Sequence, residues 1–248
     1  MNRAKLNGAG GSGWVQLLKV DVDLGQALDA EDLATCAEEV VAPSAVLKPG
    51  VWHAPRDSSS TLFVCDGLLL RELTIGRRRG AELLGPGDVL SAGDGPATNG
   101  LPVKAGVRWR VLEDTRVAVL EQRFWQSAAR WPEVFAAVVD RAIARAQALG
   151  VHLAVSSLPR VEDRLLLLFW QLSDRWGRVT ADGLRLNLPL THEVLGELVG
   201  AQRPTVTSAL SRLARRGDLV RCDDGGWVLQ ADSALDAAAL ETLTAAAA

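Results

Sequence analysis

Five arginines gather on one short stretch near the C-terminal end of the sequence. Between Gln202 and Arg221 they stand against a single aspartate, although the whole chain has a formal net charge of −3. They are Arg203, Arg212, Arg215, Arg216 and Arg221. Because arginine can form paired hydrogen bonds with guanine and can contact phosphates, a local excess of it is typical of a nucleic-acid-binding surface. A solvated helix could carry the same charges, so the surrounding elements decide how far this interpretation goes.

Two short helices are expected to position these arginines. Thr191 is a good N-cap for the first helix, and Gly200 suits the tight turn that follows it. Pro204 then falls in the first turn of the second helix, where a missing N–H costs nothing. The expected buried residues are Val194, Leu195, Leu198 and Val199 in the first helix, and Val206, Ala209, Leu210 and Leu213 in the second. The outer face of the second helix comprises Arg203, Thr205, Thr207, Ser208, Ser211, Arg212 and Arg215.

Further elements flank this helix pair on both sides. A helix is expected over Val161–Trp176, followed by a strand within Thr180–Pro189, where leucines alternate with polar residues. After the second helix, Leu219–Val220 and Trp227–Leu229 are apolar runs on either side of a turn rich in Asp and Gly. Strand, helix, turn, basic helix and hairpin together predict a winged helix-turn-helix.

The N-terminal half has a different pattern. Residues 1–13 are rich in Gly and small polar residues and are expected to form a disordered tail. Helical spacing over Leu24–Val41 predicts one or two short helices. From Ser44 to Val119, short apolar runs alternate with turn clusters, which predicts an antiparallel sandwich or barrel.

Helical spacing returns over residues 124–157, with two apolar stripes. The first stripe is Trp131, Phe135, Val138, Ala142 and Leu149, and Arg145 interrupts it. The second is Val134, Val139, Ile143 and Ala146. We expect the barrel to cover one stripe and the same helix of a second copy to cover the other, which makes the chain a homodimer. The alternative is a helix buried inside a larger monomer.

Composition excludes several other classes of protein. The three cysteines lie far apart, so we expect buried free thiols and no bound metal. No apolar run approaches the roughly 20 residues of a membrane span, and no signal peptide is visible, so a cytoplasmic protein without a membrane partner is expected. No nucleophile motif or phosphate-binding loop is present, and we expect no enzyme activity and no cofactor.

The stretch "LPLTHEVLGELVGAQRPTVTSALSRLARRGDLV" resembles the DNA-binding domain of the Crp–Fnr family of bacterial transcription regulators. The resemblance is specific over Pro189 to Leu229, and the order of the preceding elements agrees with it. It implies an α+β fold: an N-terminal antiparallel β-barrel of the cyclic-nucleotide-binding-like, jelly-roll type, a long dimerisation helix and a C-terminal winged helix-turn-helix. The implied domains are residues 14–123 for the sensor, 124–157 for the dimerisation helix and 158–248 for the DNA-binding domain.

The resemblance also implies which residues contact DNA. Family members touch phosphates at positions matching Thr191 and His192, read bases at Arg203, Pro204 and Ser208, and hold the backbone near Gln202 and Thr205. The basic outer face adds Thr207, Arg212 and Arg215. The cyclic-AMP receptor type has acidic and basic readers where Pro204 and Ser208 stand here, so we expect a different operator sequence.

The sensor departs further from the family pattern. In the family that this chain resembles, a cyclic-nucleotide site has a Gly-Glu pair that holds the ribose, followed by an Arg-Ser or Arg-Thr pair that neutralises the phosphate. Neither pair occurs here after Gly87–Leu90. Lys104 and Arg108 are the possible substitutes for the phosphate contact, and Asp94 for the ribose contact, although solvated loop residues are the simpler interpretation. A phosphate buried without an arginine would leave its charge uncompensated. We therefore expect that cyclic AMP does not control the protein, and the effector stays unknown.

These observations predict a DNA-binding transcription regulator of the Crp–Fnr type that binds palindromic operators as a homodimer. Its partners would be double-stranded DNA, a second copy of the chain and, if it is an activator, RNA polymerase. The alternative from another class is a ligand-binding signalling module whose helix-turn-helix serves protein contacts. An electrophoretic shift with genomic fragments separates the two hypotheses.

Overall fold

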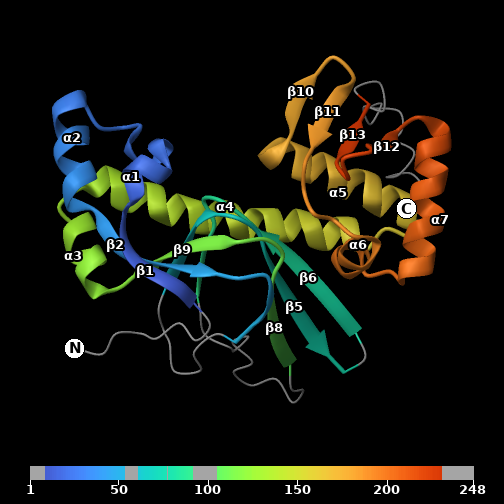
Figure 1. Cartoon of the computed structure of the whole chain (residues 1–248), viewed down its shortest axis with the longest axis horizontal. Helices are drawn as coiled ribbons and strands as arrows, with labels where there is room; N and C mark the ends of the chain where they lie inside the picture. The colour runs from blue at the N-terminus through green and yellow to red at the C-terminus, as the bar shows by residue number, and fades with distance from the viewer. Residues whose placement is uncertain (1–8, 54–60, 77, 92–104, 231–248) are drawn as a thin grey trace. The chain divides into compact units, whose positions relative to one another are not determined.

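The structure is a computed structural model that describes residues 9–53, 61–76, 78–91 and 105–230. The chain divides into two compact units, Met1–Val151 and His152–Ala248. The elements of both units are drawn in Figure 1. Each unit is described by itself.

Two antiparallel sheets form the centre of the N-terminal unit. The first has the strand order β1-β2-β9-β4-β7, with β1 Ala9–Gln16, β2 Val41–Leu47, β9 Thr115–Leu120, β4 Thr61–Asp66 and β7 Val89–Ser91. The second has the order β3-β8-β5-β6, with β3 Gly50–Trp52, β8 Ala105–Val111, β5 Leu69–Ile75 and β6 Arg78–Leu84. Side chains from both sheets meet in one buried cluster, in which the rings of Trp52 and Trp109 lie 5.8 Å apart, edge to face. The predicted antiparallel jelly-roll fold is confirmed, although the sheets do not close into a barrel.

Helices cover the other face of the first sheet. They are α1 Leu17–Val20, the short 3₁₀ helix η1 Val22–Gly25, α2 Ala30–Glu39, α3 Gln122–Ala128 and the first part of α4 Pro132–Ser156. Phe63 on β4 and Ala118 on β9 pack there against Phe124 of α3 and Val134 and Val138 of α4. This second core fixes which side of α4 faces the sandwich.

Two predictions about the N-terminal unit need correction. Residues 9–13, assigned to a disordered tail, belong to β1, because their backbone pairs with β2 from Leu47 to Ser44. Residues 1–8 lie outside the described part of the chain. The single helix expected over 124–157 is two helices, since α3 ends at Ala128 and α4 begins at Pro132. Proline lacks the N–H that would continue a helix but is well suited to starting one.

The C-terminal unit has the elements that the sequence predicts and one further strand, β10 Arg178–Thr180. Helix α5 spans Val161–Trp176, and the sheet order is β10-β11-β13-β12, with β11 Gly183–Leu186, β13 Trp227–Leu229 and β12 Leu219–Arg221. Helices α6 His192–Val199 and α7 Arg203–Arg216 stand between β11 and β12 along the chain. Phe169 of α5 packs on the buried ring of Trp227, 5.0 Å away between centroids.

The division between the units falls inside α4, after Val151, a few residues before the boundary expected between residues 157 and 158. In the described ranges, no helix combines the length and the apolar character needed to cross a membrane.

Candidate nucleic-acid interface

Local interactions fix α6 against α7 as the sequence predicts. The Thr191 hydroxyl oxygen accepts a hydrogen bond from the Val194 N–H, 3.2 Å away, and so caps α6. Gly200 has a φ of +66° in the left-handed region that favours glycine. A Cβ on Gly196 would lie 2.6 Å from the Ala201 carbonyl oxygen, so glycine lets the turn close tightly against α6. All eight expected inner-face residues of the two helices are buried.

The outer face of α7 is exposed and polar. Three of its hydroxyls donate to the carbonyl four residues earlier: Thr207 to Arg203, Ser208 to Pro204, and Ser211 to Thr207, over 2.9–3.1 Å. A serine or threonine hydroxyl has one hydrogen and two lone pairs, so these groups now present acceptors outward. Such acceptors suit the amino groups on base edges better than they suit phosphate oxygens.

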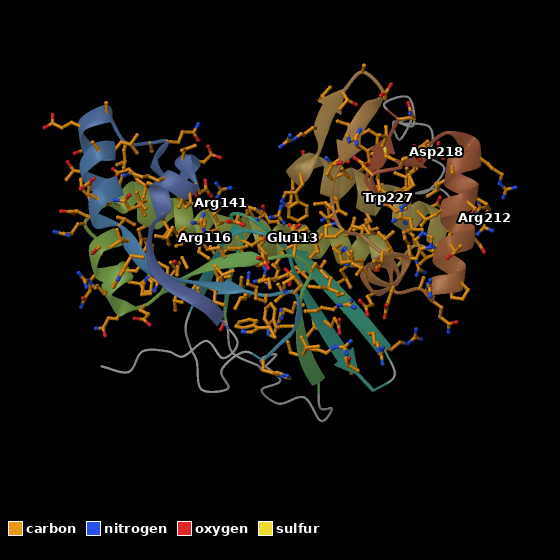
Figure 2. The ribbon with its side chains drawn as sticks, viewed as in Figure 1. Glu113, Arg116, Arg141, Arg212, Asp218 and Trp227 are labelled. Carbon is orange, nitrogen blue, oxygen red and sulfur yellow. The ribbon has the colours of Figure 1, made fainter. Side chains whose placement is uncertain are left out.

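The five arginines have different surroundings. Arg203 is exposed at the start of α7 and has no acidic partner among the described residues. Arg212 pairs with Glu162 of α5, and Arg216 pairs with Asp218. Figure 2 labels Arg212 on α7. Arg215 donates from Nε to the Ser211 carbonyl oxygen over 3.3 Å. Arg203 is therefore the arginine of α7 that is best placed to meet a ligand.

Helix α5 constrains Arg212, which was predicted to contact DNA. Burial alone would raise the pKa of Glu162, but its own backbone N–H and Arg212 lower this pKa below the ordinary range. The carboxylate is therefore charged at neutral pH and holds the arginine side chain toward α5. Sequence reasoning missed this partner because Glu162 lies fifty residues away along the chain.

His192 and Arg221 lie near the beginning of α7. The imidazole of His192 is half-buried, with Nδ1 2.9 Å from the Thr207 hydroxyl oxygen. Burial, followed by the charges of Arg221 and Arg203, lowers the pKa of His192. The guanidinium of Arg221, on β12, lies over the Trp227 ring at 5.1 Å from its centroid. Arg221 was counted among the local charges in the sequence but was not predicted to contact DNA.

The other predicted DNA contacts also lie around this surface. The exposed residues Thr191 and Gln202 immediately precede α6 and α7, and Pro204, Thr205, Thr207 and Ser208 are exposed on the first two turns of α7. The structure thus brings these residues together with Arg203 and His192 on one surface. Arg212 and Arg215 lie farther along α7.

Helix α4 carries the residues predicted for the dimer interface, but its two sides differ from the predicted stripes. Val134 and Val138 are buried in the core of the N-terminal unit, and Trp131 packs against the same core while its Nε1 donates to Glu39. Val138 is therefore unavailable to a second chain, and placing it in the dimer interface was wrong. Beside this buried face, the exposed residues Phe135, Val139, Ala142, Ile143 and Ala146 form a continuous band, which we call the α4 stripe. Leu149 is half-buried.

The predicted stripes joined residues three and four apart, and this spacing alone does not locate the edge of the buried face. At about 100° per residue, Val138 lies only about 40–60° from Phe135 and Ala142, so these neighbours can stand on the two sides of that edge. Arg145, which interrupts the first predicted stripe, was the available signal that this stripe faces something polar. It lies on the same side as Val138.

Arg145 reaches a buried carboxylate in the sandwich. Its Nε and Nη2 donate to the two oxygens of Glu82 on β6 over 2.6 and 2.8 Å, and Nη1 donates to the Val89 carbonyl oxygen over 3.3 Å. Burial alone would lower the pKa of Arg145, but the hydrogen bonds and charge of Glu82 raise it. Arg71 on β5 is the second cation near Glu82, with Nη1 3.7 Å from Oε2.

The residues considered for a nucleotide site are only partly described. Lys104 and Asp94 lie outside the described residues, as does most of the stretch before β8. Arg108 pairs with the buried Glu72 on β5, which also lies 3.3 Å from Nε of Arg110. Arg108 is thus held by a protein carboxylate. Burial raises the pKa of the Cys36 and Cys65 thiols to about 11, so both are protonated at neutral pH.

Comparison with known proteins agrees with this architecture. Residues 160–237 match the model of the Crp-like helix-turn-helix domain. Over a stretch of 74 residues, the chain is 35% identical to the regulatory protein CysR of Synechococcus elongatus. This stretch makes up 29% of this chain and 36% of that protein. The chain thus matches little more than a third of the length of this curated relative.

Solved structures share the fold over most of the chain. A cyclic nucleotide-binding domain containing protein from Listeria monocytogenes has a TM-score of 0.63 at 16% identity, covering 87% of this chain and 99% of that one. FixK2 from Bradyrhizobium japonicum has a TM-score of 0.57 at 17% identity, and the match covers 76% of this chain and 92% of that one. Residues 160–237 are thus similar to the Crp-like helix-turn-helix domain, and the resemblance to Crp–Fnr regulators that the sequence predicts is confirmed there.

Proposed function

We propose that this protein is a DNA-binding transcription regulator of the Crp–Fnr type that binds palindromic operators as a homodimer. The observation that carries the proposal is the outer face of α7, which has no acidic residue. Arg203, which has no acidic partner among the described residues, begins a row of exposed Thr and Ser side chains there. A helix with short polar side chains and a terminal arginine can enter the major groove and reach base edges. The match to the Crp-like domain supports the same conclusion.

The other parts of the proposal follow from this function. The α4 stripe would be covered by the same stripe of a second copy, because a two-fold dimer places two recognition helices on two half-sites. Since the proposed ligand is chromosomal DNA, we expect the protein to act in the cytoplasm, without catalysis. If it activates transcription, RNA polymerase would be a further partner.

Replacing Arg203 with alanine is expected to weaken binding to a selected operator by about 1–3 kcal/mol, because a paired contact to one base would be lost. The variant should also lose the preference for a particular base at one base pair in each half-site. The measurement is equilibrium binding of the wild type and Arg203→Ala to the operator and to its single-base variants. The matched control is Arg216→Ala on the same helix, since Arg216 is already paired with Asp218.

Two outcomes would contradict the proposal. If Arg203→Ala weakens binding but keeps the base preference of the wild type, the docking of α7 proposed here is wrong. If the wild type shifts no genomic fragment in electrophoresis, the alternative of a signalling module with a protein-binding helix-turn-helix is favoured.

A further inference from the structure

Three cationic or protonatable side chains gather at one end of α7, and each comes from a different element. His192 is the first residue of α6, Arg203 is the first residue of α7, and Arg221 ends β12. Arg221 is oriented by the ring of Trp227, which is itself buried against Phe169. The N-terminus of α7 adds the partial positive charge of its free N–H groups. This group has the character of an anion site.

The hydrogen bonds determine which nitrogen of His192 carries the proton. The Thr207 hydroxyl has one hydrogen, which it donates to the Arg203 carbonyl oxygen over 3.0 Å. Its contact of 2.9 Å with Nδ1 therefore uses the hydroxyl oxygen as acceptor and Nδ1–H as donor. A neutral imidazole has only this one N–H, so Nε2 carries a lone pair and cannot donate to a phosphate.

The charges around His192 keep the imidazole neutral in the free protein. Burial and the two arginines, Arg221 from β12 and Arg203 from α7, lower the pKa of His192 below its ordinary value of 6.5. On its own helix the neighbouring charge is Glu193, which is exposed, and α5 presents Arg164, which donates to the Val199 carbonyl oxygen at the far end of α6. The turn after β12 adds the exposed Asp223.

We propose that His192 and Arg221 together hold one phosphate group of the DNA backbone, next to the base contact of Arg203, and that His192 takes up a proton when they do so. The proposal rests on the proposed function. A phosphate oxygen beside the two arginines offsets their charge, and its own charge favours imidazolium. The proton comes from solvent and binds at Nε2, which becomes a donor to the phosphate while Nδ1–H stays on Thr207. Binding is therefore tightened by protonation.

The sign of the pH dependence follows from this step. The folded, free protein has a lowered His192 pKa and the complex has a raised one, so protons are taken up between these two values. Affinity for DNA should rise by about tenfold per half-site as the pH falls from about 8 to about 6. Because the contact is to the backbone, a selected operator and an unselected duplex of the same length should show the same dependence.

The test is equilibrium binding of the full chain to both duplexes across this pH range at constant ionic strength. His192→Gln should make affinity independent of pH, while His53→Gln, at an exposed position in the N-terminal unit, should keep the wild-type dependence. Arg221→Ala should weaken binding to both duplexes and reduce the slope of log affinity against log salt by about 1 per half-site. The matched control is Arg79→Ala on β6.

A second measurement counts the protons directly. The binding enthalpy of the wild type in buffers with different ionisation enthalpies gives the number of protons taken up, and near pH 6.5 this number should be positive. Zero uptake, or uptake that persists in His192→Gln, would overturn the proposal. DNA binding that is absent at every pH would instead contradict the proposed function, so the two failures are distinguishable.

Discussion

Replacing Arg145 with methionine is expected to destabilise the N-terminal unit by about 3–5 kcal/mol, because it leaves the Glu82 carboxylate buried without its main partner. Glu82 is only 8% exposed, and Arg145 supplies two of its hydrogen bonds. Arg71 remains 3.7 Å away and offsets part of the loss. The free energy of unfolding in urea, followed by the fluorescence of the buried tryptophans, measures the change.

Helix α4 offers a matched control one turn earlier. Arg141 donates to both carboxylate oxygens of Asp21 over 2.9 Å, but its side chain is about a third exposed. Arg141→Met should therefore cost only about 1 kcal/mol. The double variant Glu82→Leu with Arg145→Met should recover part of the stability lost in Arg145→Met, since no carboxylate is then left unpaired. Equal losses for Arg141→Met and Arg145→Met would show that burial of the ion pair does not matter.

The second large effect concerns the α4 stripe. Val139 and Ile143 are 40% and 50% exposed within the chain, so the double variant Val139→Glu with Ile143→Glu should fold normally as a single chain. In a two-fold dimer it would bury like charges against each other, at a cost of several kcal/mol. The variant should sediment as a monomer at micromolar concentration and lose its affinity for a palindromic operator.

Two further substitutions on α4 sharpen this test. Ala144→Glu places a charge on an exposed position away from the stripe and should leave the dimer intact. Val138→Glu should unfold the N-terminal unit instead of dissociating a dimer, because Val138 is 1% exposed in the core. A wild type that sediments as a monomer, or a stripe variant that stays dimeric, would contradict pairing through α4.

The C-terminal unit was largely predictable from sequence because its elements are short and each has local signals. Thr191 caps α6 as expected, Gly200 takes the left-handed turn, and α5 begins and ends at the predicted residues. Helical spacing also identified every buried apolar side chain of the α6–α7 pair. Here local preference and tertiary packing agree, so pattern alone was sufficient.

Elsewhere, long-range partners decided the structure. Residues 9–13 are glycine-rich and have no strand pattern, and they are extended because β2 pairs with them. Strand β8 was overlooked even though Val107, Trp109 and Val111 alternate with Arg108 and Arg110, since that stretch was compared with a nucleotide-binding pattern. The partners of Arg145 and Arg212 lie 63 and 50 residues away, and no local signal identifies them.

The most direct test of the account is selection of bound DNA from a random pool by the full-length wild type. If α7 reads the major groove from a two-fold dimer, the selected sequences should share an inverted repeat, with half-site centres separated by about one helical turn of 10–10.5 base pairs or a multiple of it. Arg203→Ala should select the same repeat with one base pair per half-site degenerate. A pool without enrichment, or enrichment of a single unrepeated site, would contradict the account.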